Sequence, residues 1–379
     1  MRLKTLKNNG LKILQGNEAC AEGALAAECK FFAGYPITPS TEIPEHLSSR
    51  IFEEGGRYVQ FEDELASICA VIGGRWGGAR SMTATSGPGF TLVQEAIGYA
   101  IVTESPIVIA DIMRGGPSTG QPTFPSQQDV MQAKFGSHGD YELIALAPSS
   151  VQEMFDFTVR AFNLADQYRV PALVMSDEIL GHMREKMVIP DQVEIFDYRH
   201  EGITRTYYKP DENHVPPRIS FFEGHSVLLD GQLHDERGIR AGHLPEVSAA
   251  AVRHYSDKIL KNIDKITDVK KFHEKDMDVA VVAYGSVVRS ALSAVNQARE
   301  NGLKAGLLKI NSLWPIPEKE IEAFCKNAKK IIVPEMNIGQ YIREVARIVG
   351  KERTVAMPCL GGMLHTPQTI LNKIKEGIQ

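Results

Sequence analysis

The sequence has few cysteines and no pair of them at metal-binding or redox-type spacing. Five cysteines occur among 379 residues, and no two form a C-x-x-C pair. The odd count argues against a disulfide framework, and the missing C-x-x-C argues against a self-contained iron–sulfur or structural zinc site. Cys20, Cys29 and Cys69 lie among Ala, Leu and Ile and are expected to be small buried hydrophobic residues. Any redox centre must therefore come from outside this chain.

Long apolar runs are also missing. No run approaches the roughly 20 residues that a bilayer-spanning helix needs. The chain begins with the basic Met1-Arg2-Leu3-Lys4, but no unbroken apolar segment with a small-residue cleavage site follows. These patterns predict a cytoplasmic protein with no membrane association. The formal net charge of −5 argues against a protein that wraps nucleic acid.

The common nucleotide-binding motifs are absent as well. There is no G-x-G-x-x-G fingerprint and no glycine-rich loop ending in Gly-Lys-Ser/Thr, which disfavours a nicotinamide- or nucleotide-binding protein. What the composition does provide is a core, because 43% hydrophobic and 23% charged residues are typical of a folded soluble protein. At 379 residues, we expect two domains with an insertion rather than one domain.

Short apolar runs alternate with helical patterns up to about residue 190, which we assign to a first domain, 1–190. Strands are expected at 31–34, 81–85, 106–112 and 170–175, and helices at 18–30, 65–76 and 151–165. This alternation predicts a mainly parallel sheet that is covered by helices on both faces.

A second α/β unit is predicted over 276–379. Strands are expected at 279–284, 305–310, 330–334 and 354–357, and helices at 287–300, 317–325, 339–349 and from residue 367. The stretch 191–275 between the two units is rich in Pro, Gly and charge, and seven of the eleven histidines lie between His200 and His273. No pair of them has metal-ligand spacing on a clear helix, so an irregular linker or partner-clasping insertion is favoured over a metal or pH-sensing site.

Four loops follow expected strands and should meet at the carboxyl edge of the sheet, where ligands of parallel sheets bind. The first is Tyr35-Pro36-Ile37-Thr38-Pro39-Ser40-Thr41, which two prolines stiffen and which offers three hydroxyls at an expected helix N-terminus. Such an end suits a carboxylate or phosphate. An ordinary N-cap formed by Ser40 or Thr41 explains the same residues equally well.

The second loop carries three acids, Glu62-Asp63-Glu64, directly before an apolar helical pattern. Acids at a helix start are stabilised by the helix dipole, and this explanation is favoured from the residues alone. The alternative is that one carboxyl points into a dry interface, where burial raises its pKa and a nitrogen base can share its proton.

The remaining two loops are rich in small residues. Ser86-Gly87-Pro88-Gly89 permits close backbone approach to a ligand, which is a weak signal alone. Arg114 follows a buried strand and opens the small-residue loop 115–123, so it can form a bidentate pair with a carboxylate such as that of a 2-oxoacid. The alternative is a surface loop held by an arginine–carbonyl bond.

In this order, the loops resemble those of the alpha subunit of 2-oxoacid:ferredoxin oxidoreductases, especially the 2-oxoglutarate type. The matching segments are 16–19 (GNEA), 34–42 (GYPITPSTE), 62–66 (EDELA), 85–89 (TSGPG), 114–120 (RGGPSTG), 233–238 (LHDERG) and 334–340 (PEMNIGQ). Each segment is moderately specific, but seven in sequence order span nearly the whole chain.

The resemblance implies an α/β fold of two three-layer, parallel-sheet domains joined by an irregular insertion. The first domain is similar to the domain that binds the pyrimidine of thiamine diphosphate, and the last resembles the C-terminal domain of transketolase. The diphosphate half, with its Gly-Asp-Gly motif and Mg²⁺ ligands, is expected in a beta subunit. This chain has neither Gly-Asp-Gly nor iron–sulfur cysteines, so it resembles a half-site without a metal of its own.

The resemblance also assigns residues. Glu64 would hydrogen-bond N1′ of the aminopyrimidine, where a carboxylic acid favours the imino tautomer that removes the C2 proton of thiamine. Whether Glu62, Asp63 or Glu64 faces the ring is left open. Thr38 and Arg114 would contact the carboxylate or 2-oxo group of the substrate. The remaining candidates are cofactor-binding Pro36, Ile37, Gly87 and Pro88, and substrate-binding Ser118 and Thr119.

The implied activity is the coenzyme A-dependent oxidative decarboxylation of 2-oxoglutarate to succinyl-coenzyme A, with reduction of ferredoxin. Beta, gamma and ferredoxin-like delta subunits are the expected partners, and the iron–sulfur clusters would lie in them. The same chemistry on branched-chain 2-oxoacids or pyruvate is an alternative. A non-catalytic scaffold subunit is a second one, although the presence of Glu64, Thr38 and Arg114 favours an active half-site.

Overall fold

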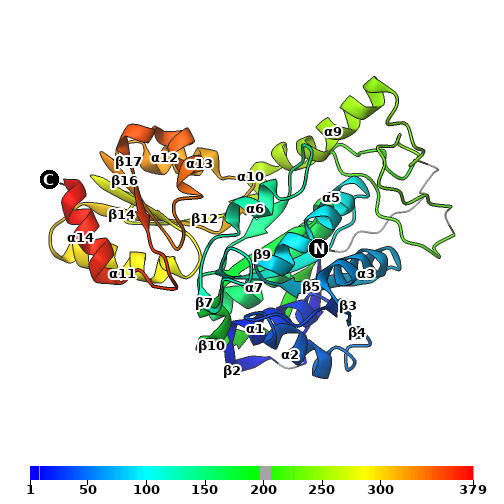
Figure 1. The fold of residues 1–379 in the computed structure, drawn as a ribbon, viewed down its shortest axis with the longest axis horizontal. Helices are drawn as coiled ribbons and strands as arrows, with labels where there is room; N and C mark the ends of the chain where they lie inside the picture. The colour runs from blue at the N-terminus through cyan, green and yellow to red at the C-terminus, as the bar shows by residue number, and fades with distance from the viewer. Residues whose placement is uncertain (8, 197–205, 225, 379) are drawn as a thin grey trace.

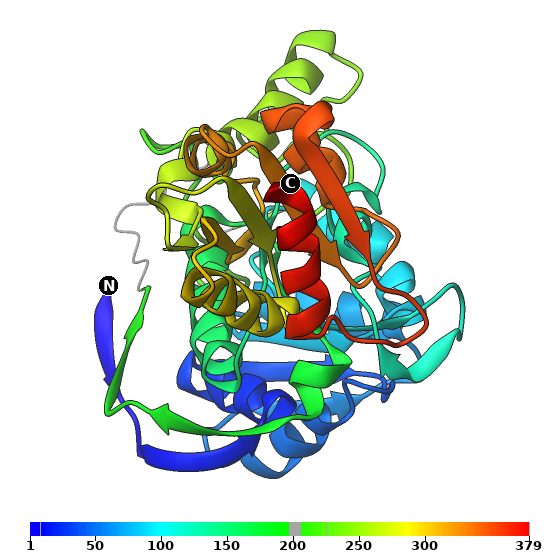
Figure 2. The same ribbon diagram turned by 90° about the vertical axis from the view of Figure 1, so that its left-hand side faces the viewer.

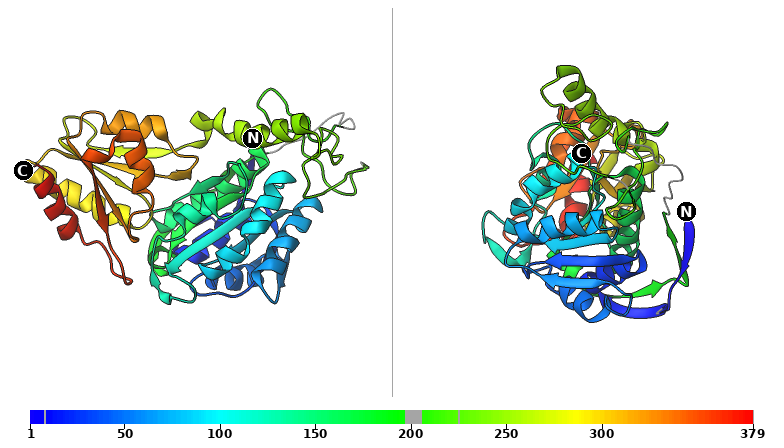
Figure 3. Two further views of the ribbon diagram at one scale, coloured as in Figure 1. Left: turned by 45° about the horizontal axis from the view of Figure 1, so that its top comes forward. Right: turned by 90° about the vertical axis from the view of Figure 1, so that its right-hand side faces the viewer.

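The computed structural model describes residues 1–7, 9–196, 206–224 and 226–378, and its two largest β-sheets each lie at the centre of one α/β lobe. The second lobe lies to the left in Figure 1, in yellow to red, beside the larger first lobe. Another view shows the two lobes side by side (Figure 3, left). The predicted α/β class with two parallel-sheet domains is confirmed.

The first sheet runs in the order β15-β8-β9-β6-β5-β3-β4, with β7 attached to β6. Its strands are β3 (Cys29–Gly34), β4 (Arg57–Gln60), β5 (Arg80–Thr85), β6 (Val108–Gly115), β7 (Gln121–Pro125), β8 (Ile144–Leu146), β9 (Ala172–Asp177) and β15 (Ser312–Trp314). The path from β8 to β4 is parallel, and only β7 and β15 pair antiparallel. Strands β5, β6 and β9 are buried at every position, as expected for parallel strands between helical layers.

Helices cover this sheet. They are α1 (Gly16–Ala26), α2 (Glu42–Arg50), α3 (Glu64–Trp76), α4 (Pro88–Leu92), α5 (Gln94–Val102), α6 (Val130–Phe135), α7 (Val151–Tyr168) and α8 (Glu178–His182). Helix α1 packs against α2 and α7, whereas α3 packs against α4 and α5. The small residues of α1 permit a close approach, since a Cβ at Gly23 would lie 2.6 Å from the carbonyl oxygen of Phe155 on α7.

Two details of the first domain differ from the sequence-based expectation. The helix expected to reach residue 30 ends at Ala26, because Glu28 adopts a left-handed φ of 64° and β3 begins at Cys29. Cys20 and Cys29 are buried as predicted, but Cys69 is exposed. It lies one turn after the exposed Leu65, on the solvent-facing side of α3.

The second sheet has the order β12-β14-β13-β16-β17. Its strands are β12 (Val269–Phe272), β13 (Val279–Ala283), β14 (Ala305–Ile310), β16 (Lys330–Glu335) and β17 (Thr354–Pro358). The helices are α11 (Val287–Glu300), α12 (Glu318–Cys325), α13 (Ile342–Val349), the 3₁₀ turn η1 (Lys351–Arg353) and α14 (Pro367–Ile378). Helix α11 packs against α14, and α12 packs against α13. The strands and helices predicted from 279 onward are confirmed.

The pairing of strands crosses the boundaries expected from the sequence. Strand β12 precedes residue 276 yet pairs antiparallel with β14, and β15 follows it yet pairs antiparallel with β8 of the first sheet. The described residues 206–224 and 226–244 form no helix or strand apart from one bridge between His234 and Arg240. The chain then forms α9 (Pro245–Leu260) and α10 (Ile263–Ile266), because proline starts α9 and an apolar stripe with Tyr255 and Ile259 is buried.

The first residues form an arm that was not predicted from the sequence. Strands β1 (Arg2–Thr5) and β2 (Gly10–Gln15) pair antiparallel with β11 (Gln192–Ile195) and β10 (Arg184–Ile189). Figure 2 shows this arm, in blue and green, along the edge of the first lobe. Over the described ranges, none of the helices is both long enough and apolar enough to cross a bilayer.

Candidate functional site

The three acids before α3 have different environments. Glu62 is exposed, and Asp63 is the N-cap of α3, where its carboxylate accepts a hydrogen bond of 2.7 Å from the backbone N–H of Ala66. Glu64 is the first residue of the helix and is only 6% exposed. Burial raises its pKa, and the neighbouring Asp63 carboxylate adds to the rise. The favoured explanation, an acid stabilised at a helix start, therefore accounts for Asp63, whereas Glu64 is the acid whose carboxyl is buried.

Gly89 makes room for the Glu64 carboxyl. A Cβ at position 89 would lie 2.7 Å from Cδ of Glu64, and closer still to Glu64 Oε1 and to Oγ1 of Thr85. The buried Thr85 hydroxyl has no hydrogen-bond partner within the described chain. A carboxyl whose pKa is raised by burial and an unpartnered hydroxyl therefore lie together, next to a backbone without a side chain. This arrangement fits the ring nitrogen and amino group of an aminopyrimidine.

Arg114 connects the loops after β6 and β3. It is 6% exposed, and its Nη1 donates a hydrogen bond of 2.7 Å to the backbone carbonyl oxygen of Thr38. Its buried Nε has no partner in the described residues. The side chain also passes over Gly87, where a Cβ would lie 3.6 Å from Nε. The structure thus brings Arg114 and Thr38 together and leaves the buried Nε of the guanidinium without an acceptor among the described residues.

Asn17, which was not selected from the sequence as a site residue, holds the loop 35–41 in place. The fully buried Asn17 donates from Nδ2 to the carbonyl oxygen of Pro39 at 2.8 Å and to Oε2 of Glu42 at 2.7 Å. Neither Ser40 nor Thr41 caps α2 with its side chain, since Thr41 makes no cap bond and Ser40 donates to a carbonyl of its own loop. Thr41 is the N-cap residue of α2, as the N-cap interpretation expects, but no side-chain capping hydrogen bond forms. The only feature of the sequence that pointed to Asn17 was its position in the matching segment 16–19 (GNEA).

Glu42 belongs to a small ionic cluster beside this loop. His182 Nδ1 lies 3.0 Å from Glu178 Oε1, and its Nε2 lies 3.4 Å from Glu42 Oε1. The hydrogen bond to Glu178 and the nearby Glu42 carboxylate raise the pKa of His182 to about 10. The positively charged His182 thus helps to hold the Glu42 carboxylate in place, and that carboxylate in turn accepts the hydrogen bond from Asn17.

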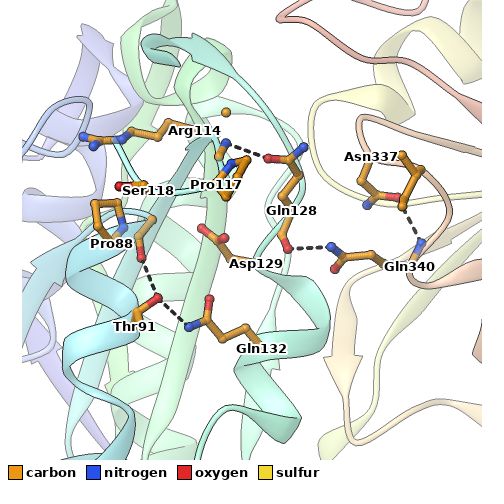
Figure 4. Close-up of a pocket in the computed structure, with 14 residues that line it drawn as sticks. Pro88, Thr91, Arg114, Pro117, Ser118, Gln128, Asp129, Gln132, Asn337 and Gln340 are labelled. Atoms are coloured by element: carbon orange, nitrogen blue, oxygen red, sulfur yellow. Dashed lines mark hydrogen bonds between the residues drawn. The ribbon is translucent and has the colours of Figure 1, made fainter. Parts of the chain in front are cut away.

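A pocket of about 550 Å³ lies between the two domains (Figure 4). The sequence-predicted residues among its walls are Gly87, Pro88, Arg114 and Ser118. The further lining residues are Thr91, Gly115, Gly116, Pro117, Gln128, Asp129, Gln132, Asn337, Ile338 and Gln340. Carboxyl-end loops of both sheets therefore face one cavity.

The other predicted site residues are distributed around this pocket rather than in its walls. Glu64 adjoins it behind Gly89, and Thr38 adjoins it through Arg114. Pro36 and Thr119 are exposed and Ile37 is half-buried. None of these three lines the cavity.

The polar residues that join the two domains at the pocket were not predicted from the sequence. Gln340 Nε2 donates to the backbone carbonyl oxygen of Gln128 at 2.6 Å, and Gln128 Oε1 accepts from the backbone N–H of Gly116 at 2.7 Å. Asn337 Nδ2 donates to the carbonyl oxygen of Gln127 at 2.6 Å. Figure 4 shows the chain from Gln340 through Gln128 to the Arg114 loop. Asn337 and Gln340 lie in the PEMNIGQ segment, which was the one signal that pointed to them.

None of the described residues of the His-rich stretch 191–275 lines this pocket. His200 and His225 lie outside the described residues. In the ranges that the structure does describe, no three His, Cys, Asp or Glu side chains are grouped so that they could hold a metal ion.

Comparison with known proteins matches both halves of the chain. Residues 22–253 match the family described as "Pyruvate flavodoxin/ferredoxin oxidoreductase, thiamine diP-bdg", and residues 277–370 match "Pyruvate:ferredoxin oxidoreductase core domain II". The "2-oxoglutarate synthase subunit KorA" of Methanothermobacter marburgensis is 53% identical over 365 residues, which cover 95% of this chain and 97% of the relative. The "Ketoisovalerate oxidoreductase subunit VorB" of the same organism is 36% identical over 96% of this chain and 97% of its own.

Comparison with solved structures points to the same family. The 2-oxoglutarate:ferredoxin oxidoreductase from Magnetococcus marinus, with 2-oxoglutarate, coenzyme A and succinyl-CoA bound, superposes with a TM-score of 0.93 at 32% identity. The match covers 99% of this chain, which spans 66% of the length of that one. A split-gene transketolase, an inactive beta4 tetramer, superposes with a TM-score of 0.52 at 12% identity over 96% of each chain, a likeness of fold alone. The chain belongs to the 2-oxoacid:ferredoxin oxidoreductases, as a subunit with the thiamine diphosphate-binding domain of that family.

Proposed function

We propose that this chain is the alpha subunit of a coenzyme A-dependent 2-oxoglutarate:ferredoxin oxidoreductase and supplies the pyrimidine half of its thiamine diphosphate site. The observation that carries the proposal is the buried Glu64 carboxyl with its raised pKa, lying against Gly89 beside the unpartnered Thr85 hydroxyl. The higher identity to the 2-oxoglutarate synthase subunit than to the ketoisovalerate subunit supports 2-oxoglutarate over branched-chain substrates.

Glu64 would hold a proton at N1′ of the aminopyrimidine. When bound, thiamine diphosphate supplies the nucleophilic carbon that adds to the 2-oxo group and makes loss of CO₂ feasible. A carboxyl that stays protonated more readily than usual is suited to donate to a ring nitrogen, because burial disfavours its anion. Gly89 keeps the carboxyl in place by leaving its space free.

Arg114 and Thr38 would receive the substrate. The free Nε of Arg114 can donate to the carboxylate of a 2-oxoacid, while Nη1 remains on the Thr38 carbonyl and fixes the guanidinium plane. Pro36, Ile37, Gly87 and Pro88 would contribute to binding the cofactor, and Gly87 and Pro88 lie in the pocket wall. Ser118 and Thr119 would face the substrate's side chain, and Ser118 already lies in the pocket wall.

The remaining parts of the enzyme would come from other chains. The diphosphate and its Mg²⁺ need a beta subunit, because this chain has no Gly-Asp-Gly segment. The iron–sulfur clusters and the ferredoxin contact need further subunits, because no C-x-x-C pair is present. Gamma and ferredoxin-like delta subunits are the proposed sources, and the assembly is proposed to work in the cytoplasm.

The test compares two acids that lie two residues apart. In the assembled complex, Glu64→Gln should lower the rate of 2-oxoglutarate-dependent viologen reduction by roughly 10²- to 10⁴-fold, the range for loss of an acid–base group. The exchange of the thiamine C2 proton, followed by proton NMR, should fall with it. Glu62→Gln, at the neighbouring exposed position, should leave both rates unchanged. Normal exchange in the Glu64 variant would show that another group activates the cofactor.

The substrate is tested separately with the wild-type complex. Coenzyme A, viologen and one 2-oxoacid at a time should give a higher kcat/KM for 2-oxoglutarate than for 2-oxoisovalerate or pyruvate. A preference for either of the other acids would move the chain to that activity without changing the role of Glu64.

A further inference from the structure

Three successive carbonyl groups in the loop after β3 each accept a side-chain hydrogen bond. The Ile37 carbonyl oxygen accepts its bond from within the loop. The Thr38 carbonyl oxygen accepts from Arg114 Nη1 at 2.7 Å, and the Pro39 carbonyl oxygen accepts from Asn17 Nδ2 at 2.8 Å. The first bond closes the loop on itself, whereas the other two attach it to β6 and to α1.

Asn17 is an amide at a position where the helix would favour an acid. It is the second residue of α1, and a carboxylate near a helix N-terminus is stabilised by the dipole. Both of its partners are acceptors, however, because Nδ2 faces the Pro39 carbonyl oxygen at 2.8 Å and Glu42 Oε2 at 2.7 Å. An ionised aspartate could donate to neither of them. The same two acceptors also fix which end of the amide faces the loop.

The Asn17 side chain has little room to turn away from the loop. It is 0% exposed, and its Oδ1 would lie 2.9 Å from a Cβ at Gly181 on α8. A Cβ at Gly16 would in turn lie 2.0 Å from the carbonyl oxygen of Leu180. Two glycines thus let α1 and α8 approach closely around the amide. Asn17 is therefore a rigid support for the loop.

The bond from Asn17 reaches the proposed substrate-binding groups in two steps. Pro39 and Thr38 are consecutive residues, so a displacement of one carbonyl group also displaces the other. The Thr38 carbonyl oxygen accepts from Arg114 Nη1, and the Nε of the same guanidinium is the buried donor without a partner in the described residues. The position in which Asn17 holds Pro39 therefore sets the positions of Thr38 and Arg114.

We propose that Asn17 is a positioning residue for the 2-oxoacid, because it holds Thr38 and Arg114 where they meet the carboxylate and the 2-oxo group. The inference rests on the proposed function, since it takes Thr38 and Arg114 as the residues that contact these two groups. All 2-oxoacids share the carboxylate and the 2-oxo group and differ in the side chain. Asn17 therefore sets the affinity for the whole class and not the choice among its members.

Replacing Asn17 with leucine removes the donor and keeps a side chain of similar size. In the assembled complex, Asn17→Leu should raise KM for 2-oxoglutarate about tenfold, the factor by which loss of one buried hydrogen bond changes an equilibrium constant. The value of kcat should change much less, because saturating substrate refills the site. For any second 2-oxoacid that the wild-type complex accepts, KM should rise by the same factor.

Asn163→Leu is the matched control for a merely structural role. Asn163 is a buried asparagine on α7, whose Nδ2 donates to the Glu194 carbonyl oxygen at 2.8 Å and whose Oδ1 accepts from the Phe196 backbone N–H at 2.9 Å. None of these three residues lines the pocket. The control should lose a similar amount of stability in urea unfolding and keep the wild-type KM.

The outcomes distinguish the inference from the proposed function. A wild-type KM in Asn17→Leu, a rise for one 2-oxoacid alone, or an equal rise in Asn163→Leu overturns the inference and leaves the activity intact. A wild-type complex that oxidises none of the 2-oxoacids overturns the proposed function instead. Should Asn17→Leu fail to assemble, Asn17→Ala removes the same donor from a smaller side chain. A raised KM in that variant supports the inference, and an unchanged KM overturns it.

Discussion

Replacing Gly89 with alanine tests the placement of Glu64 without touching a chemical group. The backbone at 89 is helical, so alanine adopts it without strain and the only change is the added methyl group. Its carbon would lie 2.7 Å from Glu64 Cδ and closer still to Glu64 Oε1, whereas ordinary contact begins at 3.4 Å, so the carboxyl must retreat by at least about 0.7 Å. A displacement approaching 1 Å can cost on the order of 10²-fold in rate. Overpacking should also cost about 1–3 kcal/mol of unfolding free energy.

The measurements are kcat for viologen reduction by the complex, C2-proton exchange, and urea unfolding. Gly73→Ala is a matched control, because Gly73 lies on the helix that carries Glu64, is exposed, and would place its new Cβ more than 4 Å from any neighbouring atom. It should stabilise α3 by up to about 1 kcal/mol and leave kcat unchanged. A Gly89→Ala enzyme with wild-type kcat and exchange would refute the view that Glu64 acts from this position.

Two further perturbations address the loops. His182 has a folded pKa of about 10, above its unfolded value, so its charge contributes stability that is complete below about pH 6 and is lost as the pH rises through 10. His182→Gln should therefore cost about 1 kcal/mol at neutral pH, after allowance for solvent screening, and nothing at about pH 11, as measured by urea unfolding. Gln340→Ala removes the bond to the Gln128 carbonyl and should destabilise the chain by about 1–3 kcal/mol and raise KM several-fold. An unchanged KM would show that the Arg114 loop keeps its place without the second domain.

The alternation of elements could be predicted because parallel strands are continuous apolar runs. Strands such as β13 and β14 and the helix α11 between them follow directly from composition and periodicity. The arm formed by β1 and β2 could not be predicted, since its partners β10 and β11 lie more than 160 residues away and its strands are largely exposed. Strand β15 is three residues long, which is too short to show the apolar pattern that predicts a strand.

The residues of the candidate site likewise fall into some that could be predicted from the sequence and others that could not. Loops that follow buried strands were found because their position and glycine content carry the signal, and Glu64 and Arg114 lie in them. Asp129 and Gln128 were missed, because each is a single polar residue whose importance depends on what another strand or domain places beside it. Asn17 was found only as part of a matching segment, since nothing in the sequence indicates that its amide reaches the Pro39 carbonyl.

Strand β15 has a consequence for how the protein can be divided. It comes from the second half of the chain, yet its pairing covers the outer edge of β8 in the first sheet, and the indole of its last residue, Trp314, donates to the Val130 carbonyl oxygen at 2.9 Å. A fragment that ended before residue 312 would leave the β8 edge without its partner, as a template for aggregation. Expression of the first lobe alone should therefore give insoluble material, and the two lobes should melt in one cooperative transition. We therefore expect the two domains to fold and unfold as one unit.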